Sequence, residues 1–220
     1  MIGILGGTFD PVHFGHLRTA LEVMQGVGLE EVRFIPLFQA VHRDQPEVSP
    51  RLRLKMVQIA IQGQQGFVAD DREMQRTGDS YSVDTLRELR QAWPDKPLCL
   101  LLGMDAFSGF PEWRRPDEIL RLAHLIVMQR PGQGEGDPTD PRVRGMVEAH
   151  RCMRRSQLKE RGAGCIFFQP VTQLQISASH IRAMVATGQS PRYLLPEPVL
   201  RVIEENRLYQ SERSTPFDGA

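Results

Sequence analysis

The sequence predicts a doubly wound α/β domain, in which a parallel sheet is covered by helices on both faces. Short apolar runs alternate with stretches of helical periodicity along most of the chain, and the run at 97–103 is apolar throughout. A strand covered on both faces is expected to lack polar residues, whereas a half-exposed strand alternates. The regular succession of strands and helices favours right-handed crossovers between parallel strands.

Each expected strand is a short apolar run, and each expected helix carries apolar residues three or four positions apart. The first strand, at 1–5, leads into a helix at 14–25, in which Phe14, Leu17 and Leu21 share a face. Further strands are expected at 31–37, 67–70, 97–103, 124–131 and 164–170. Further helices are expected from Pro50, at 82–93, in the short stretch after residue 103, at 178–187 and at 198–206.

The composition is that of an ordinary globular protein. Hydrophobic residues make up 40% of the 220 residues, and 27 basic residues balance 27 acidic ones. This balance gives no reason to expect a nucleic acid or an anionic membrane as partner, so anion binding has to be local. No run approaches the eighteen apolar residues of a membrane span, and we expect neither a membrane span nor an export signal.

The three cysteines form no CxxC pair and no metal-binding spacing. Cys99 lies in an apolar run and is expected to be a small buried side chain, while Cys152 and Cys165 stand apart. This usage fits a reducing compartment, and we expect a cytoplasmic protein.

A single domain is expected over residues 1–209, followed by a flexible tail at 210–220. Residues 132–162 are expected to form a surface excursion, because a segment rich in Gly, Pro and acidic residues precedes a basic helical stretch from His150 to Lys159. That stretch fits either a nucleic-acid-binding arm or a solvated helix. The absence of aromatic residues favours the solvated helix.

The segment between the first strand and the first helix is rich in glycine and histidine. Gly6 and Gly7 are expected in the turn, where glycine allows unusual dihedral angles and close approach to a phosphate, and Thr8 adds a hydroxyl. His13 and His16 are three residues apart, so they share one face at the start of the helix and can donate to phosphate oxygens. Alternatively, one imidazole only caps the loop or packs on a neighbouring ring, and a zinc site lacks further ligands.

Two well-known phosphate-binding patterns are absent from the sequence. No GxxxxGK[ST] motif is present, and no GxGxxG follows the first strand. Phosphate binding therefore requires another arrangement.

The segment GGTFDPVHFGH at 6–16 resembles the signature of the nucleotidyltransferase superfamily, which includes class I aminoacyl-tRNA synthetases. The segment ISASHIR at 176–182 resembles the second superfamily element, at the start of a late helix. Three intervening stretches are similar to bacterial nicotinate-nucleotide adenylyltransferases, as is the closing segment at 194–209. These stretches are SYSVDTL at 80–86, LLGMDAFSGFPEWRRPDEIL at 101–120 and HLIVMQRPG at 124–132.

The resemblance covers residues 1 to about 209 and implies a Rossmann-like fold. It also implies a reaction between ATP and nicotinate mononucleotide, with Mg²⁺, that gives the dinucleotide and pyrophosphate in NAD biosynthesis. The implied catalytic residues are His13, His16 and Arg182. The implied ATP-binding residues are Gly6, Gly7, Thr8, Phe9, His13, His16, Gly103, Asp105, Ile176, Ser177, Ser179 and Arg182. The resemblance assigns no certain protein ligand to the metal, which is expected to bind mainly through the ATP phosphates.

Ser177 and Ser179 are also candidate helix caps, and Arg182, expected in the first turn, can bind phosphate with its planar fork or be a surface residue. The residues implied to bind nicotinate mononucleotide are Thr8, His42, Arg43, Thr85, Trp113 and Arg114. Trp113 would stack on the pyridine ring, unless it is a core or lid tryptophan. Three residues depart from the family pattern: Ala40, Val41 and His180.

Other functions stay open from the sequence. One is an adenylyltransferase for another phosphomonoester, such as nicotinamide mononucleotide or phosphopantetheine. Another is a non-catalytic ATP-binding module of the same fold. The sequence leaves the number of copies in an assembly open, and a homo-oligomer is compatible with it.

Overall fold

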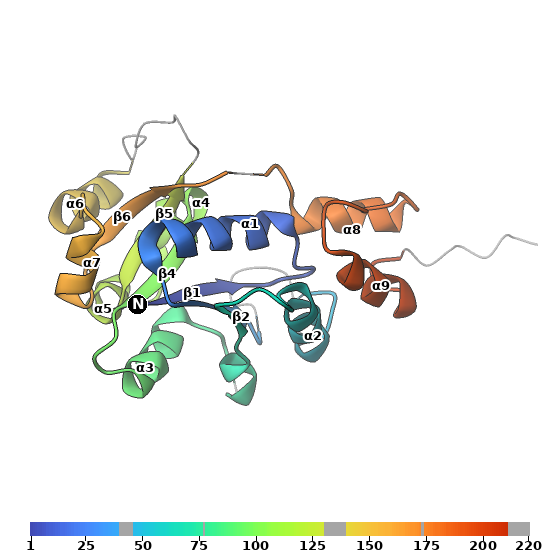
Figure 1. Cartoon of the computed structure of the whole chain (residues 1–220), viewed down its shortest axis with the longest axis horizontal. Helices are drawn as coiled ribbons and strands as arrows, with labels where there is room; N and C mark the ends of the chain where they lie inside the picture. Colours follow the sequence, from blue (N-terminus) through green and yellow to red (C-terminus); the bar gives the residue numbers. More distant parts are fainter. Residues whose placement is uncertain (40–45, 77, 130–139, 173, 211–220) are drawn as a thin grey trace, which may run out of the picture.

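In the computed structural model of the chain, residues 1–39, 46–76, 78–129, 140–172 and 174–210 are described, and six strands form one sheet (Figure 1). The strands are β1 Ile2–Gly7, β2 Glu31–Pro36, β3 Phe67–Ala69, β4 Leu98–Gly103, β5 His124–Gln129 and β6 Ile166–Pro170. Every neighbouring pair is parallel, and the order is β3-β2-β1-β4-β5-β6. This is a strand order of doubly wound dinucleotide-binding folds, which confirms the predicted fold class.

Helices connect the strands, close to the positions expected from the sequence. They are α1 Phe14–Val23, α2 Pro50–Ala60, α3 Ser82–Ala92, α4 Met104–Ser108, α5 Pro116–Leu122, α6 Pro141–His150, α7 Ser156–Arg161, α8 Ala178–Ala186 and α9 Glu197–Glu205. Shorter helical turns follow α1 at Met24–Gly28, β3 at Arg72–Gln75 and α4 at Phe110–Glu112.

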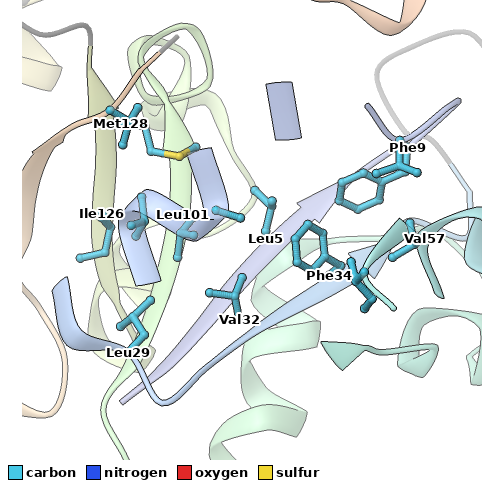
Figure 2. Close-up of a cluster of buried hydrophobic side chains, with 14 of the residues drawn as sticks. Leu5, Phe9, Leu29, Val32, Phe34, Val57, Leu101, Ile126 and Met128 are labelled. Atoms are coloured by element: carbon cyan, nitrogen blue, oxygen red, sulfur yellow. The ribbon is translucent and has the colours of Figure 1, made fainter. Parts of the chain in front are cut away.

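Two apolar layers form the core, one on each face of the sheet. Strand residues alternate between them: Leu101 belongs to the layer that includes residues of α1, α2 and α9, whereas Leu100 and Leu102 belong to the layer that includes residues of α3, α4 and α5. Figure 2 shows the first layer, in which Phe9 and Phe34 lie side by side near the end of β1. The site described below therefore lies next to a buried, apolar core.

The two glycines of the first turn differ from their expected conformation. Gly6 and Gly7 are the last residues of β1, in register with Ile35 and Pro36, so they end the strand rather than form the turn. The left-handed conformation expected of glycine is taken instead by Phe9, with φ of 49°. The prediction was wrong because β2 is long enough to pair with both glycines.

The surface excursion contains two helices rather than one continuous basic helix. Between α6 and α7, Arg151 forms a bridge with Ile166 of β6, which ends the first helix. Cys152 and Cys165 are joined by a disulfide here, whereas Cys99 is buried and free as expected. Thus the expectation of reduced thiols fails for one pair.

Parts of three predicted segments fall outside the described residues: 130–131 of the strand expected at 124–131, 132–139 of the excursion and 211–220 of the tail. Within the described part of the chain, no helix is long and apolar enough to span a membrane.

Candidate active site

The candidate site lies where the chain connections of the sheet reverse direction. β1 lies between β2 and β4, and the chain leaves β1 toward one face and β4 toward the other. In open parallel sheets, ligands bind in the crevice beyond the carboxyl ends of such strands. Gly7 and Gly103 are the last residues of β1 and β4, and a Cβ at Gly103 would meet nothing within 4 Å. The backbone at this crevice is accordingly accessible to a ligand.

His13 and His16 come together at the start of α1, as predicted. His13 is the N-cap residue, and the two imidazoles stack with ring centroids 3.7 Å apart. The rings of Phe9 and His16 pack edge to face with centroids 5.1 Å apart, and the Phe9 ring is buried. Both the predicted pairing and the alternative contact with Phe9 therefore occur together.

Gly15 is required by the position of the His13 ring. A Cβ on Gly15 would lie 2.9 Å from both Cε1 and Nδ1 of His13. It would also lie 3.4 Å from the carbonyl oxygen of Ile176, in the second signature segment at 176–182. The glycine between the histidines thus lets the imidazole and the later segment approach the same helix start.

The imidazoles are neutral in the free protein. Burial lowers the pKa of His13 to about 4, and burial together with the charge of His13 lowers the pKa of His16 to about 3. The backbone N–H of His13 donates to Nδ1 of His16 over 3.3 Å, so the proton of the neutral His16 ring is on Nε2. His16 therefore offers a neutral hydrogen-bond donor, while His13 Nδ1 is buried without a partner among the described residues.

The second signature segment packs directly on the first. The Arg182 guanidinium donates from Nη1 to the Asp10 carbonyl over 2.9 Å and from Nε to the Glu47 carboxylate over 2.8 Å. Leu194 also accepts a backbone hydrogen bond from Phe14, at the start of α1. The starts of α1 and α8 consequently face the same region above the sheet.

The capping of α8 follows the sequence prediction in part. Ser177 is the N-cap, and its hydroxyl accepts from the His180 backbone N–H. Ser179 bonds the Ser177 hydroxyl over 3.2 Å and lies within the first turn. Arg182 is the fifth residue of α8 and so lies in the second turn rather than the first. Both serines are exposed, which leaves their hydroxyls accessible to an anion.

A buried carboxylate beneath the histidine turn was not identified from the sequence. Asp10 is 2% exposed, and its two oxygens accept from the Tyr209 hydroxyl and the Glu47 backbone N–H. The peptide bond between Asp10 and Pro11 is cis. No local pattern signals a contact that spans almost the whole chain.

Two of the residues expected to bind the mononucleotide, Thr85 and Arg114, lie near the start of α3. The Arg114 guanidinium lies 4.3 Å from the ring centroid of Tyr81, the residue before α3. Trp113 is half-buried and packs on Phe110, with ring centroids 5.5 Å apart. Ser80 fixes the same corner, because its hydroxyl accepts from the backbone N–H groups of Phe38 and Gln39 after β2.

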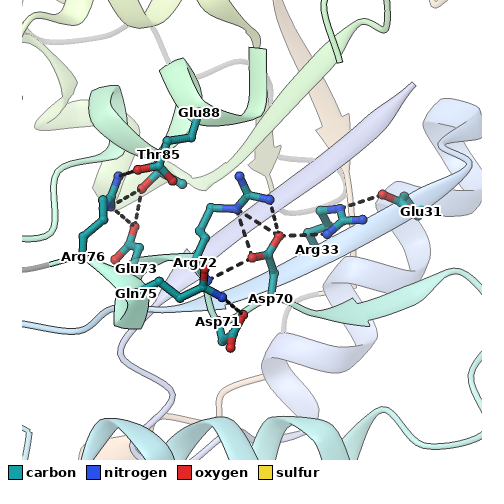
Figure 3. Close-up of polar contacts among 10 residues, drawn as sticks. All are labelled: Glu31, Arg33, Asp70, Asp71, Arg72, Glu73, Gln75, Arg76, Thr85 and Glu88. Carbon is teal, nitrogen blue, oxygen red and sulfur yellow. Dashed lines mark hydrogen bonds and ion pairs between the residues drawn. The ribbon is translucent and has the colours of Figure 1, made fainter. Parts of the chain in front are cut away.

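Thr85 lies near the start of α3, and both its backbone N–H and its hydroxyl already have partners. Its backbone N–H is 3.3 Å from the Tyr81 carbonyl. Its hydroxyl donates to Glu73 over 2.6 Å and accepts from Arg76 over 2.8 Å, as Figure 3 shows. The second Glu73 oxygen is buried without a partner among the described residues. The contact of Thr85 with substrate stays a prediction.

Asp105 and the residues at 40–43 complete the set singled out from the sequence. Asp105 is exposed in the first turn of α4, directly after β4. His42 and Arg43, with Ala40 and Val41, lie outside the described residues. In the parts of the chain that the structure describes, no group of three or more His, Cys, Asp or Glu side chains is placed to hold a metal ion.

The strand order and the two facing helix starts define a nucleotidyltransferase fold, and the family model described as cytidylyltransferase-like matches residues 4–184. A probable nicotinate-nucleotide adenylyltransferase of Methylococcus capsulatus is 45% identical over 210 residues, which are 95% of this chain and 99% of that protein. A protein of the same description from Aeromonas hydrophila is 44% identical over 209 residues, 95% of this chain and 97% of its own. The chain belongs to the nicotinate-nucleotide adenylyltransferase family.

The fold is also shared with a solved structure, the nicotinic acid mononucleotide adenylyltransferase of Plasmodium falciparum complexed with NaAD. The TM-score is 0.68 at 16% identity, with 94% of this chain and 96% of that chain covered. At this identity the likeness supports the fold alone.

Proposed function

We propose that the protein transfers the adenylyl group of ATP to nicotinate mononucleotide, forming nicotinate adenine dinucleotide and pyrophosphate in NAD biosynthesis. The observation that carries this proposal is the approach of the stacked His13 and His16 rings and the segment that starts α8, at the helix that follows β1, in a chain of this family. A phosphate oxygen of the mononucleotide attacks the α-phosphorus of ATP. A new P–O bond forms there, and the bond to the β-phosphate oxygen breaks to release pyrophosphate.

The nucleophile needs no general base. The second pKa of a phosphomonoester is about 6, so the attacking oxygen is already ionised at neutral pH. What the protein supplies is alignment and stabilisation of the negative charge that develops on the α-phosphate. The neutral imidazoles, whose lowered pKa values make them poor bases for any proton at pH 7, serve as hydrogen-bond donors.

The ATP phosphates are assigned to the region between the two helix starts. The first turns of α1 and α8 present backbone N–H groups and the positive ends of the helix dipoles. Because Nδ1 of His16 accepts the hydrogen bond from His13, Nε2–H on the other side of the ring is the donor that the ring can offer to a phosphate. Arg182 uses Nε and Nη1 for Glu47 and Asp10. These contacts orient its guanidinium toward the same region, where phosphate competes with Glu47.

We assign Mg²⁺ as the divalent ion, carried with ATP. Mg²⁺ keeps several waters and is commonly held by substrate phosphates and one or two carboxylates, so it needs no preformed protein cage. Asp105, exposed directly after β4, is the carboxylate that we expect to hold it. When bound, the ion neutralises charge on the pyrophosphate leaving group.

The acceptor site is assigned to the corner formed by Tyr81, Thr85, Trp113 and Arg114. Trp113 is expected to stack on the pyridine ring. The backbone N–H groups of Thr85 and Arg114 are expected to face the nicotinate carboxylate, which requires the bond from Thr85 to the Tyr81 carbonyl to open. A neutral amide would leave such donors poorly matched, which favours the acid form of the substrate.

The direct test uses ATP labelled at the α-phosphate together with Mg²⁺ and nicotinate mononucleotide. We expect the label in the dinucleotide, with one pyrophosphate released for each dinucleotide formed. Label recovered only in ATP or AMP would contradict adenylyl transfer. The His16→Ala variant is expected to lower kcat at least about a hundredfold, as when a charge-stabilising donor is lost.

A further inference from the structure

Arg53 is a fully buried cation, and each nitrogen of its guanidinium donates to a backbone carbonyl. It lies in α2 with 0% exposure. Nη1 donates to Thr8 over 2.6 Å, Nη2 to Leu37 over 2.7 Å, and Nε to Val48 over 3.0 Å. None of these partners is charged, and no carboxylate among the described residues forms an ion pair with Arg53. Such a group is costly to bury, which calls for a role beyond filling space.

The three carbonyls belong to the segments that surround the phosphate region. Thr8 directly follows β1, and Leu37 directly follows β2. Val48 precedes α2, next to Glu47, which contacts Arg182. One planar fork therefore fixes the exits of two central strands relative to α2.

The bond to Thr8 fixes a peptide of unusual conformation. The peptide that carries the Thr8 carbonyl also carries the Phe9 N–H, and Phe9 has a left-handed φ of 49°. This conformation is unfavourable for a bulky residue and persists only where surrounding contacts hold it. A cation on the Thr8 carbonyl both holds the peptide plane and polarises its N–H as a donor.

We propose that Arg53 is a positioning residue for adenylyl transfer: it holds the Thr8–Phe9 peptide and places a buried positive charge behind the ATP phosphates. The inference rests on the proposed function, because that function puts the phosphates at this turn. Asp10 and Glu73 are the acidic groups whose charges act on Arg53 without bonding it. The positive charge of Arg53 thus acts on the phosphate region through the carbonyl groups that it binds.

The test compares Arg53→Lys and Arg53→Met with Lys55→Met, an exposed cation on the same helix. Thermal unfolding and circular dichroism establish which variants fold, and ATP affinity is measured by calorimetry without any acceptor. We expect Arg53→Met to lower kcat about a hundredfold and to weaken the binding of ATP, because small displacements of aligned groups have this effect. Arg53→Lys, which keeps the charge but not the fork, is expected to be intermediate, and Lys55→Met unchanged.

An Arg53→Ala variant provides a second readout in case Arg53→Met does not fold. Millimolar guanidinium is expected to restore part of its ATP affinity and turnover, whereas Lys55→Ala does not respond. Folded Arg53 variants with normal ATP affinity and kcat would overturn the proposal and leave a purely structural residue. Failure of the wild-type protein to use nicotinate mononucleotide would instead overturn the proposed acceptor, since the ATP measurements are made without it.

Discussion

The hydroxyl of Tyr209 donates a hydrogen bond of 2.6 Å to the Asp10 carboxylate, across 199 positions of the chain. Burial, and then the neighbouring carboxylate, raise the pKa of Tyr209, so the phenol stays protonated and donates. The last described residues of the chain thereby support the turn that carries His13 and His16. The segment that leads into His13 and His16 is thus stabilised by the side chain of Tyr209, a contact that the local sequence does not reveal.

Tyr209→Phe is expected to lower the free energy of unfolding by about 2 kcal/mol, because a buried carboxylate loses a donor. The measurement is urea denaturation at pH 7. Tyr193→Phe is the matched control, since Tyr193 is 83% exposed. Equal stabilities for the two variants would show that the Asp10 bond adds nothing.

Gly15→Ala is expected to lower kcat about a hundredfold while the protein stays folded. The added Cβ would meet the His13 ring at 2.9 Å, so the imidazole has to move. Gly145→Ala in α6 is the control, because a Cβ there meets nothing within 4 Å and alanine favours a helix. Steady-state kinetics with normal turnover for Gly15→Ala would mean that the His13 position is unimportant.

The pH dependence of kcat/KM should reflect the substrate rather than the histidines. His13 and His16 have folded-state pKa values of about 4 and about 3, below the ordinary 6.5, so they stay neutral as the pH falls through 6. The acceptor phosphate gains a proton near pH 6, so kcat/KM for nicotinate mononucleotide is expected to fall about tenfold per unit below that value. NMR titration of the imidazole protons checks the assignment: titration of either ring near pH 6.5 in the free protein would contradict it.

Trp113→Ala is expected to raise KM for nicotinate mononucleotide at least about tenfold and to leave ATP affinity nearly unchanged. Stacking of a base on an aromatic side chain is worth about 1–3 kcal/mol. Trp93→Ala is the control, because Trp93 lies at the other end of α3, under Arg33. An unchanged KM for Trp113→Ala would remove the stacking role.

The fold could be predicted because its elements are local patterns. The apolar run of β4 and the spacing of Val83, Leu86 and Leu89 in α3 are both consequences of burial on a sheet face. The pairing of His13 with His16 was also local, since three residues separate them along one helix turn. Strand pairing at Gly6 and Gly7 was not predictable, because it depends on how far β2 extends beside them.

Contacts between distant parts of the chain could not be predicted from the same patterns. Tyr209 with Asp10, and Cys152 with Cys165, meet only through the tertiary fold. Arg53 did leave a signal: it lies three and four positions before Met56 and Val57, on the buried face of α2. A charged residue on an apolar helix face indicates a buried polar contact, but the sequence does not identify the three carbonyls that receive it.

The central claim is adenylyl transfer to nicotinate mononucleotide. The most direct measurement is pyrophosphate release from MgATP with nicotinate mononucleotide, nicotinamide mononucleotide or phosphopantetheine, each offered separately at the same concentration. We predict release that depends strongly on the nicotinate form. Preference for either of the other acceptors, or no release with any of them, would contradict the account.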